Sequence, residues 1–230
     1  MKVVTNDLRV RSKPEVSDRS AKLSPLLDAP QLLFVVDGPV EASGYTWYEV
    51  APIGDADTTV ELPFGWVAAA DKDGTPWLAK TTPSCPARPT TVKALWTLNG
   101  VLGLACFGET PITVRARLAQ PEATCGIDIG WSIDPDWLAS TCPQPRFLIE
   151  STTEVGLSIN STIDPSLDVS AFQPGVDLKD WVSVRLIGRF DHPAATTCHG
   201  VSTETKVPYG RDQIVLGCRA TFVITKIQAG

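Results

Sequence analysis

The residues best suited to redox or metal chemistry are six cysteines and two histidines, none of which occurs before position 85. No two cysteines have the C-x-x-C spacing of a zinc ligand pair, and two histidines add few further ligands. The even number favours disulfides instead, and pairing each cysteine with its neighbour in sequence closes the shortest loops. Six cysteines allow 15 connectivities, which the sequence alone does not resolve. The pairs that short loops favour are Cys85 with Cys106, Cys125 with Cys142, and Cys198 with Cys218.

Disulfides persist in oxidising compartments, so the cysteines predict an extracellular or cell-surface protein. Met1 is followed by Lys2 and a polar stretch, without the apolar core of a secretory signal, and we expect that a native leader has been removed. The longest aliphatic run, residues 32–36, is much shorter than the roughly 20 apolar residues of a membrane helix. No membrane insertion is expected.

Catalysis would require a base placed against a nucleophile or a metal. His192 and His199 flank Cys198, but an active thiol–imidazole pair needs a reduced cysteine, and adjacent residues of a strand point to opposite faces. The sequence contains no G-x-S-x-G, H-E-x-x-H or glycine-rich phosphate loop. We expect a protein that is not an enzyme and uses no cofactor.

Three aspartates lie near two tryptophans within residues 125–142, which the predicted Cys125–Cys142 disulfide would close. They are Asp128, Asp134 and Asp136. Such a group could bind Ca²⁺ or a sugar, but Pro135 interrupts the calcium-loop pattern and no glycine follows. The favoured interpretation is a disulfide-closed loop whose tryptophans cover one end of the domain.

The C-terminal region shows the alternation of half-buried strands. Residues 181–190 place Val182, Val184, Leu186 and Phe190 on one face. A second alternating row predicts that the last strand spans residues 213–225, with Ile214, Leu216, Cys218, Ala220, Phe222 and Ile224 inward. Pro193 predicts a short helix between the two strands, because proline suits the first helical position.

Three further stretches, residues 111–118, 147–151 and 155–161, have strand patterns, and residues 91–98 could form a short helix. Together with the two C-terminal strands they make five, the number in an OB-type Greek-key barrel. A small β-sandwich would fit the same pattern.

The N-terminal region has short strands punctuated by turns, including one predicted at Asp37-Gly38. Its ordered motifs are Leu8-x-Val10-Arg11-Ser12-x-Pro14, Trp47-Tyr48-x-Val50 and Gly65-Trp66-Val67. This succession resembles the bacterial SH3-type domain, SH3b, and implies an SH3-like barrel. An acidic loop, residues 53–61, is longer than the link usual in that family.

The predicted fold class is therefore all-β, with two small barrels. An SH3b-like domain would occupy residues 1–82, and a disulfide-stapled, five-stranded OB-like barrel would occupy residues 91–230. Residues 83–90 are rich in proline and would form an extended linker.

Two sets of residues are candidates for ligand binding. Tyr45 and Trp47 share one strand face and could form an exposed aromatic pair, although small barrels also use aromatic residues as core. Arginines on outward positions could merge into a basic stripe if their strands are neighbours: Arg115, Arg117, Arg185, Arg189 and Arg219. The alternative is a solvated face neutralised by nearby acidic residues.

The most favoured function is an exported, non-enzymatic protein that binds a cell-wall polymer or a surface protein through the SH3b-like domain. One alternative is a structural or scaffolding subunit of an extracellular assembly. Another is binding of an anionic polymer such as teichoic acid by the basic stripe. Nucleic acid is disfavoured because the net charge is −6, and because residues 156, 158 and 160, outward in the predicted strand, are not aromatic.

Overall fold

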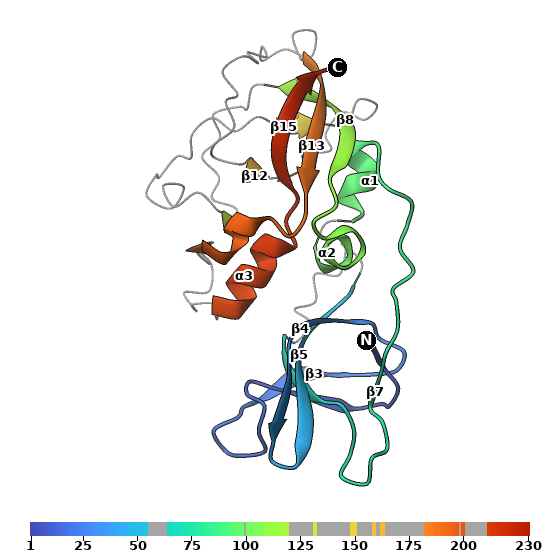
Figure 1. The fold of residues 1–230 in the computed structure, drawn as a ribbon, viewed down its shortest axis with the longest axis vertical. Coiled ribbons are helices and arrows are strands. Elements are labelled where there is room, and N and C mark those ends of the chain that lie inside the picture. Colours follow the sequence, from blue (N-terminus) through green and yellow to red (C-terminus); the bar gives the residue numbers. More distant parts are fainter. Residues whose placement is uncertain are drawn as a thin grey trace. The chain divides into compact units, whose positions relative to one another are not determined.

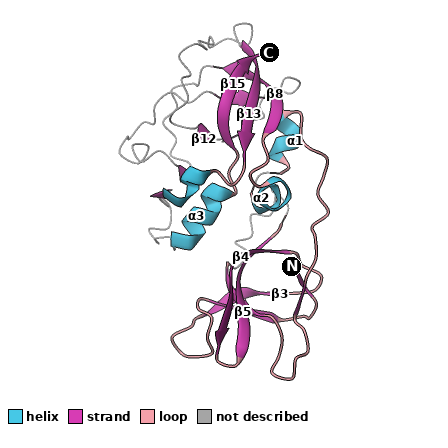
Figure 2. Cartoon of the chain, in the orientation of Figure 1, coloured by secondary structure: helices cyan, strands magenta, loops and turns pink. Residues whose placement is uncertain are grey.

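The computed structural model divides the chain into two compact units, Met1–Cys85 and Pro86–Gly230 (Figure 1). The structure describes residues 1–54, 64–98, 100–119, 131–132, 148–150, 158–159, 162–163, 182–197, 199–200 and 211–230. Residues 80–90 form neither helix nor strand. Strands make up most of the regular structure in both units, and a few short helices lie in the C-terminal unit, so the protein is mostly β (Figure 2).

The N-terminal unit is built on an antiparallel sheet with the strand order β3-β2-β6-β5-β4, beside which β1 pairs with β7. The strands are β1 (Lys2–Val3), β2 (Leu8–Arg11), β3 (Lys22–Leu27), β4 (Leu33–Ala42), β5 (Tyr45–Pro52), β6 (Gly65–Ala68) and β7 (Leu78–Ala79). Alternation explains the strand faces: Leu8 and Val10 of β2 are buried, whereas Arg9 and Arg11 are half-buried.

One sheet face carries the core of this unit. Its buried side chains are Val3, Leu8, Val10, Leu27, Leu33, Val50, Val67 and Leu78. Tyr48 packs against this cluster, so the even-numbered positions of β5 face the core. The opposite face is left to Tyr45 and Trp47.

The turn predicted at Asp37-Gly38 is wrong, because both residues lie within β4. Gly38 has a φ of +108°, and a Cβ there would lie 2.8 Å from the Trp47 carbonyl oxygen. The β4–β5 register shifts on both sides of Asp37, so the irregularity is a bulge that bends a continuing strand. The chain reverses instead at Ser43 and Gly44, whose φ values are +55° and +78°.

The C-terminal unit is built on a sheet with the strand order β11-β10-β8-β13-β15-β12. Its strands are β8 (Ile112–Ala119), β10 (Leu148–Glu150), β11 (Ser158–Ile159), β12 (Thr162–Ile163), β13 (Val182–Arg189) and β15 (Val223–Ala229). All neighbouring pairs are antiparallel except β12 and β15, which are parallel. A separate pair joins β9 (Trp131–Ser132) to β14 (His199–Gly200).

The strands predicted at residues 111–118 and 181–190 are confirmed as β8 and β13, with Ile112, Val114, Val184 and Leu186 buried. The sheet has six strands where five were predicted, because β12 adds to it. Among the described residues neither large sheet closes on itself, and no barrel is formed. The finer expectation of two barrels is therefore not established by these strands.

The predicted strand at residues 213–225 is wrong in its first half, which is the helix α3 (Arg211–Arg219), while β15 follows it. Apolar residues at 214, 216 and 218 fit a strand, but Ile214 and Cys218 also have the i, i+4 spacing of one helix face. In a helix this short the two periods are hard to separate. Tertiary contacts decide, since Ile214 and Cys218 share a cluster with Ala195 and Val223.

The predicted short helices are confirmed as α1 (Val92–Trp96), whose Thr91 hydroxyl accepts from the Ala94 amide at 3.3 Å, and as the 3₁₀ turn η3 (Pro193–Thr197). The helix α2 (Val101–Phe107) was not predicted. It presents Gly103 to the ring of Phe190, and Phe190 meets Phe222 edge to face with 5.6 Å between ring centroids.

Candidate binding site

The face of the N-terminal sheet opposite the core brings arginines and aromatics together. Residues paired across antiparallel strands share a face, and the register pairs Trp47 with Ala68, Glu49 with Trp66, and Trp66 with Arg11. The odd-numbered residues of β2 and of β5 therefore lie on the same side of the sheet.

A pocket of about 370 Å³ opens on this face, entirely within the N-terminal unit. Its lining residues are Thr5, Asn6, Asp7, Leu8, Arg9, Arg11, Val16, Tyr45, Trp47, Ala68 and Trp77. The volume is within the range of small-molecule sites, roughly 300–1,000 Å³. The lining combines aromatic rings, two guanidinium groups and one carboxylate.

Tyr45 is the centre of the aromatic side of the pocket. Its ring stacks on Trp77, with centroids 6.1 Å apart and an interplanar angle of 25°. The Tyr45 ring also meets the Trp47 ring edge to face, with 5.8 Å between the ring centroids. The Lys72 ammonium lies 5.6 Å from the Tyr45 ring centroid, within cation–π range. Contacts on several sides hold the Tyr45 ring in one orientation.

Trp47 differs from the exposed partner that the sequence predicted, because it keeps only 3% of its surface exposed. Its indole Nε1 donates to the Ala42 carbonyl oxygen at 2.8 Å, so its polar atom is used within the sheet. Tyr45 is half-buried. The pair therefore meets at the pocket, with Tyr45 as the accessible ring and Trp47 as part of the base. Ligand binding by either residue stays a prediction.

The two arginines of β2 are anchored by backbone carbonyls. Arg9 donates through Nη1 to the Leu23 oxygen at 3.2 Å, and Arg11 donates through Nη1 to the Ser20 oxygen at 3.1 Å. A guanidinium has five N–H donors, so each keeps donors beyond this one bond. Anchored donors beside stacked rings suit a ligand that has both an apolar face and carbonyl or carboxylate oxygens.

Sequence reasoning missed Arg9, Arg11, Lys72 and Trp77 as candidates. The alternation of Leu8-Arg9-Val10-Arg11 was a usable signal, since it sets both arginines on one face. Trp77 had no such signal, because it lies after the last motif strand, in a segment that the bridge between Ala70 and Pro76 folds back.

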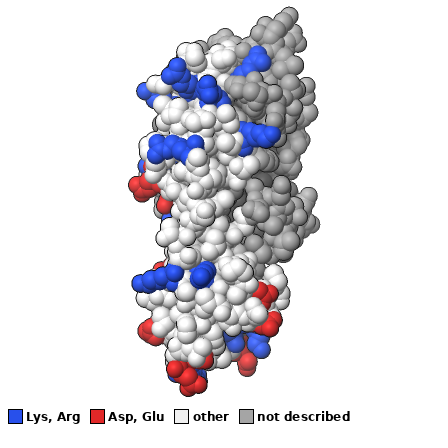
Figure 3. Space-filling view, turned by 90° about the vertical axis from the view of Figure 1, so that its right-hand side faces the viewer, with Lys and Arg blue, Asp and Glu red and all other residues white. Residues whose placement is uncertain are grey.

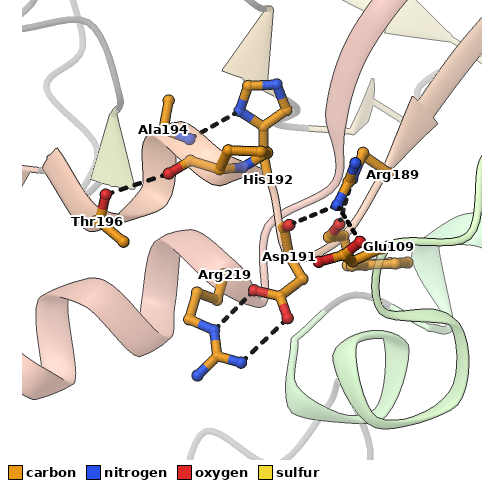
Figure 4. Close-up of polar contacts among 9 residues, drawn as sticks. Glu109, Arg189, Asp191, His192, Ala194, Thr196 and Arg219 are labelled. Atoms are coloured by element: carbon orange, nitrogen blue, oxygen red, sulfur yellow. Dashed lines mark hydrogen bonds and ion pairs between the residues drawn. The ribbon is translucent and has the colours of Figure 1, made fainter.

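The arginines predicted in the C-terminal unit do not form one stripe. Arg115 and Arg185 are directly opposite on β8 and β13, which confirms that these strands are neighbours. Arg117 lies opposite Ser183 on β13 and Glu150 on β10. Arg189 is instead paired with Glu109 at 3.3 Å (Figure 4).

Arg219 is also removed from the predicted stripe, because it ends α3 instead of lying on a strand. Its Nε and Nη2 donate to the two carboxylate oxygens of Asp191 at 2.7 and 3.0 Å (Figure 4). This hydrogen bonding raises the pKa of Arg219 above its usual value. The arginine therefore acts as a structural clamp.

The first predicted disulfide is present, as Cys85 is bonded to Cys106. Cys218 is also disulfide-bonded, and no described cysteine is free. Cys125, Cys142 and Cys198 lie outside the described residues, as do Asp128, Asp134 and Asp136 and most of the acidic loop.

His192 has a local structural role in the described part of the chain. Its Nδ1 accepts a hydrogen bond from the Ala194 amide at 3.3 Å, at the start of η3 (Figure 4). The described ranges contain no cluster of three or more His, Cys, Asp or Glu residues that could hold a metal ion. No helix in the same ranges is long and apolar enough to cross a membrane.

Comparisons with protein-family models, with curated proteins and with solved structures found no match to this chain.

Proposed function

We propose that this protein is an exported, non-enzymatic binding protein that attaches to the cell wall or cell surface through its N-terminal unit. The observation that carries the proposal is the pocket around Tyr45, with its stacked aromatic rings and anchored arginines. Export is supported by the Cys85–Cys106 disulfide, since such bonds are rare in reducing compartments.

We further propose that the N-terminal unit is an SH3b-like barrel and the C-terminal unit an OB-like one. The three SH3b-like motifs fall on β2, β5 and β6, which are adjacent in the order β2-β6-β5. The three motifs are distant in sequence but neighbours in the sheet, and this supports a common structural role for them. Four of the five strands expected for the second barrel correspond to β8, β10, β11 and β13 of the C-terminal sheet, and β15 overlaps the end of the fifth.

The pocket chemistry favours a peptide or glycan of the wall as the ligand. Flat C–H surfaces of such polymers pack on aromatic rings, and the free donors of Arg9 and Arg11 would bind their carbonyl or carboxylate oxygens. Asp7 supplies a negative group at the same pocket and Lys72 a positive one at its aromatic side, so polar ends of either sign can be recognised.

The test is retention of the oxidised full-length chain on purified peptidoglycan. Tyr45→Leu removes the stacked ring and is expected to weaken binding about tenfold, which corresponds to ~1.4 kcal/mol. The matched control is Tyr48→Leu, the same change on the core face of the same strand. It should leave retention intact and lower thermal stability instead.

Failure of the unmodified protein to bind peptidoglycan or whole cells would overturn the wall-binding proposal. Equal retention of the Tyr45→Leu and Tyr48→Leu variants would show that the pocket around Tyr45 is not the peptidoglycan-binding site.

A further inference from the structure

The β8–β13–β15 sheet of the C-terminal unit carries exposed cations whose spacing is set by the strand register. Arg115 lies directly opposite Arg185, and Lys226 lies opposite Ile187, two residues further along β13. Residues paired across strands share a face, so all three side chains leave the sheet on one side. All three are exposed. We call Arg115, Arg185 and Lys226 the Arg185 cluster.

The spacing within the cluster follows from sheet geometry. Directly opposite residues have Cβ atoms about 4.5–5.5 Å apart, and diagonal neighbours such as Arg185 and Lys226 are about 7–8 Å apart. The cluster therefore forms a row of positive charges that crosses three strands. Such a row fits negative charges repeated along a chain better than it fits one small anion.

The three charges of the Arg185 cluster form no ion pair among the described residues, in contrast to Arg189 with Glu109 and Arg219 with Asp191. Arg117 has Glu150 opposite it and is left out of the cluster. Among the described residues on the visible side of the C-terminal unit, Figure 3 shows several groups of Lys and Arg atoms, and the Asp and Glu atoms in view lie at one edge.

Two arginines directly opposite each other are destabilising for a sheet, so the arrangement has a cost that folding alone does not explain. A bound polyanion would remove this cost, because its negative charges would lie between the guanidinium groups. The uncharged positions of this face, Thr113, Ser183, Ile187 and Gln228, are not aromatic. Binding of single-stranded nucleic acid normally uses stacking aromatics, which this part of the face lacks.

We propose that the Arg185 cluster binds a flexible phosphodiester polymer without bases, such as a polyol-phosphate chain. This second site is independent of the Tyr45 pocket and lies on the other unit. Guanidinium groups bind phosphate oxygens through paired hydrogen bonds, and Lys226 adds a point charge.

The test measures binding of the oxidised full-length chain to soluble poly(ribitol phosphate) over a range of salt concentrations. The triple variant Arg115→Gln, Arg185→Gln and Lys226→Gln should weaken binding on the order of tenfold and reduce the slope of log K against log salt by about 2. The matched control replaces three exposed charged residues elsewhere in the chain, Arg19, Lys22 and Lys80, by glutamine. Equal losses in the two triple variants would overturn the proposal.

A single charge reversal distinguishes an effect on polymer binding from an effect on folding stability. Arg185→Glu places a carboxylate opposite Arg115, so it should preserve or raise the thermal stability while abolishing polymer binding. Retained binding in this variant would contradict the proposed site. Tyr45→Leu should leave binding of poly(ribitol phosphate) unchanged. The proposal for the Tyr45 pocket and the proposal for the Arg185 cluster are therefore tested independently.

The choice of polymer is tested with a thymidine oligonucleotide of matched charge. Weaker binding of the oligonucleotide than of poly(ribitol phosphate) supports a partner without bases. Equal or tighter binding of the oligonucleotide would overturn it.

Discussion

Arg219 and Asp191 join the end of α3 to the end of β13 through both side chains and backbone. The Arg219 guanidinium donates to both Asp191 carboxylate oxygens, and the Asp191 amide donates to the Arg219 carbonyl oxygen at 2.8 Å. Asp191 has a φ of +48°, a conformation in which aspartate and asparagine are among the better tolerated side chains. The clamp fixes the helix that replaces the predicted strand.

Removal of this clamp is the first prediction. Each side chain is 27% exposed, so solvent weakens the pair, and Arg219→Ala should lower the free energy of unfolding by about 1–2 kcal/mol. Hydrogen exchange of β13 amides during chemical denaturation reports the loss in this unit. Arg88→Ala, in the exposed segment without helix or strand, is the control and should change little. Equal effects would show that the ion pair adds no stability.

The second prediction concerns pH. The pKa of Arg219 is raised in the folded state. Its contribution to the free energy of unfolding is therefore fully present below the pKa of the unfolded state, and is lost only as pH rises through the pKa of the folded state. Both values lie far above neutrality. The stability difference between the parent and Arg219→Gln should therefore stay constant between about pH 6 and pH 9. Thermal unfolding at several pH values would contradict this if the difference shrank towards pH 9.

The third prediction is that Gly103 cannot accept a side chain. A Cβ would lie 2.3 Å from both the Leu98 carbonyl oxygen and the Phe190 ring, so Gly103→Ala forces α2 away from β13. The loss should reach about 3 kcal/mol, at the upper end for overpacking. Gly44→Ala is the comparison, because nothing lies within 4 Å and only its φ of +78° is strained. It should cost about 1 kcal/mol, and a smaller effect at Gly103 than at Gly44 would contradict the packing argument.

The fourth prediction is that the Cys85–Cys106 bond stabilises the chain. Replacement of both residues by alanine should lower the free energy of unfolding by about 3 kcal/mol, because the bond restricts the unfolded chain. Peptide mapping without reductant should recover Cys85 and Cys106 in one linked fragment. A free thiol on either residue in the oxidised protein would contradict the assignment.

Strand patterns in the sequence predicted most of the C-terminal sheet correctly because β8 and β13 are buried on one face only. The same method failed at residues 213–219, because the helix α3 has only nine residues, too few to separate a period of two from a helical one. It failed again at Asp37-Gly38, because a turn dipeptide also suits a bulge, and only the pairing of β4 with β5 distinguishes them.

The candidate sites show the same division. The sequence by itself determined that Arg115 and Arg185 face outward, that Tyr45 and Trp47 share a face, and that the cysteines favour disulfides, since these follow from local alternation and composition. Only the tertiary structure decided that Arg115 lies opposite Arg185, that Arg219 is held by Asp191, and that Trp77 stacks on Tyr45. The physical reason is that strand register and loop return join residues far apart in sequence, and local periodicity carries no information about which distant segments meet.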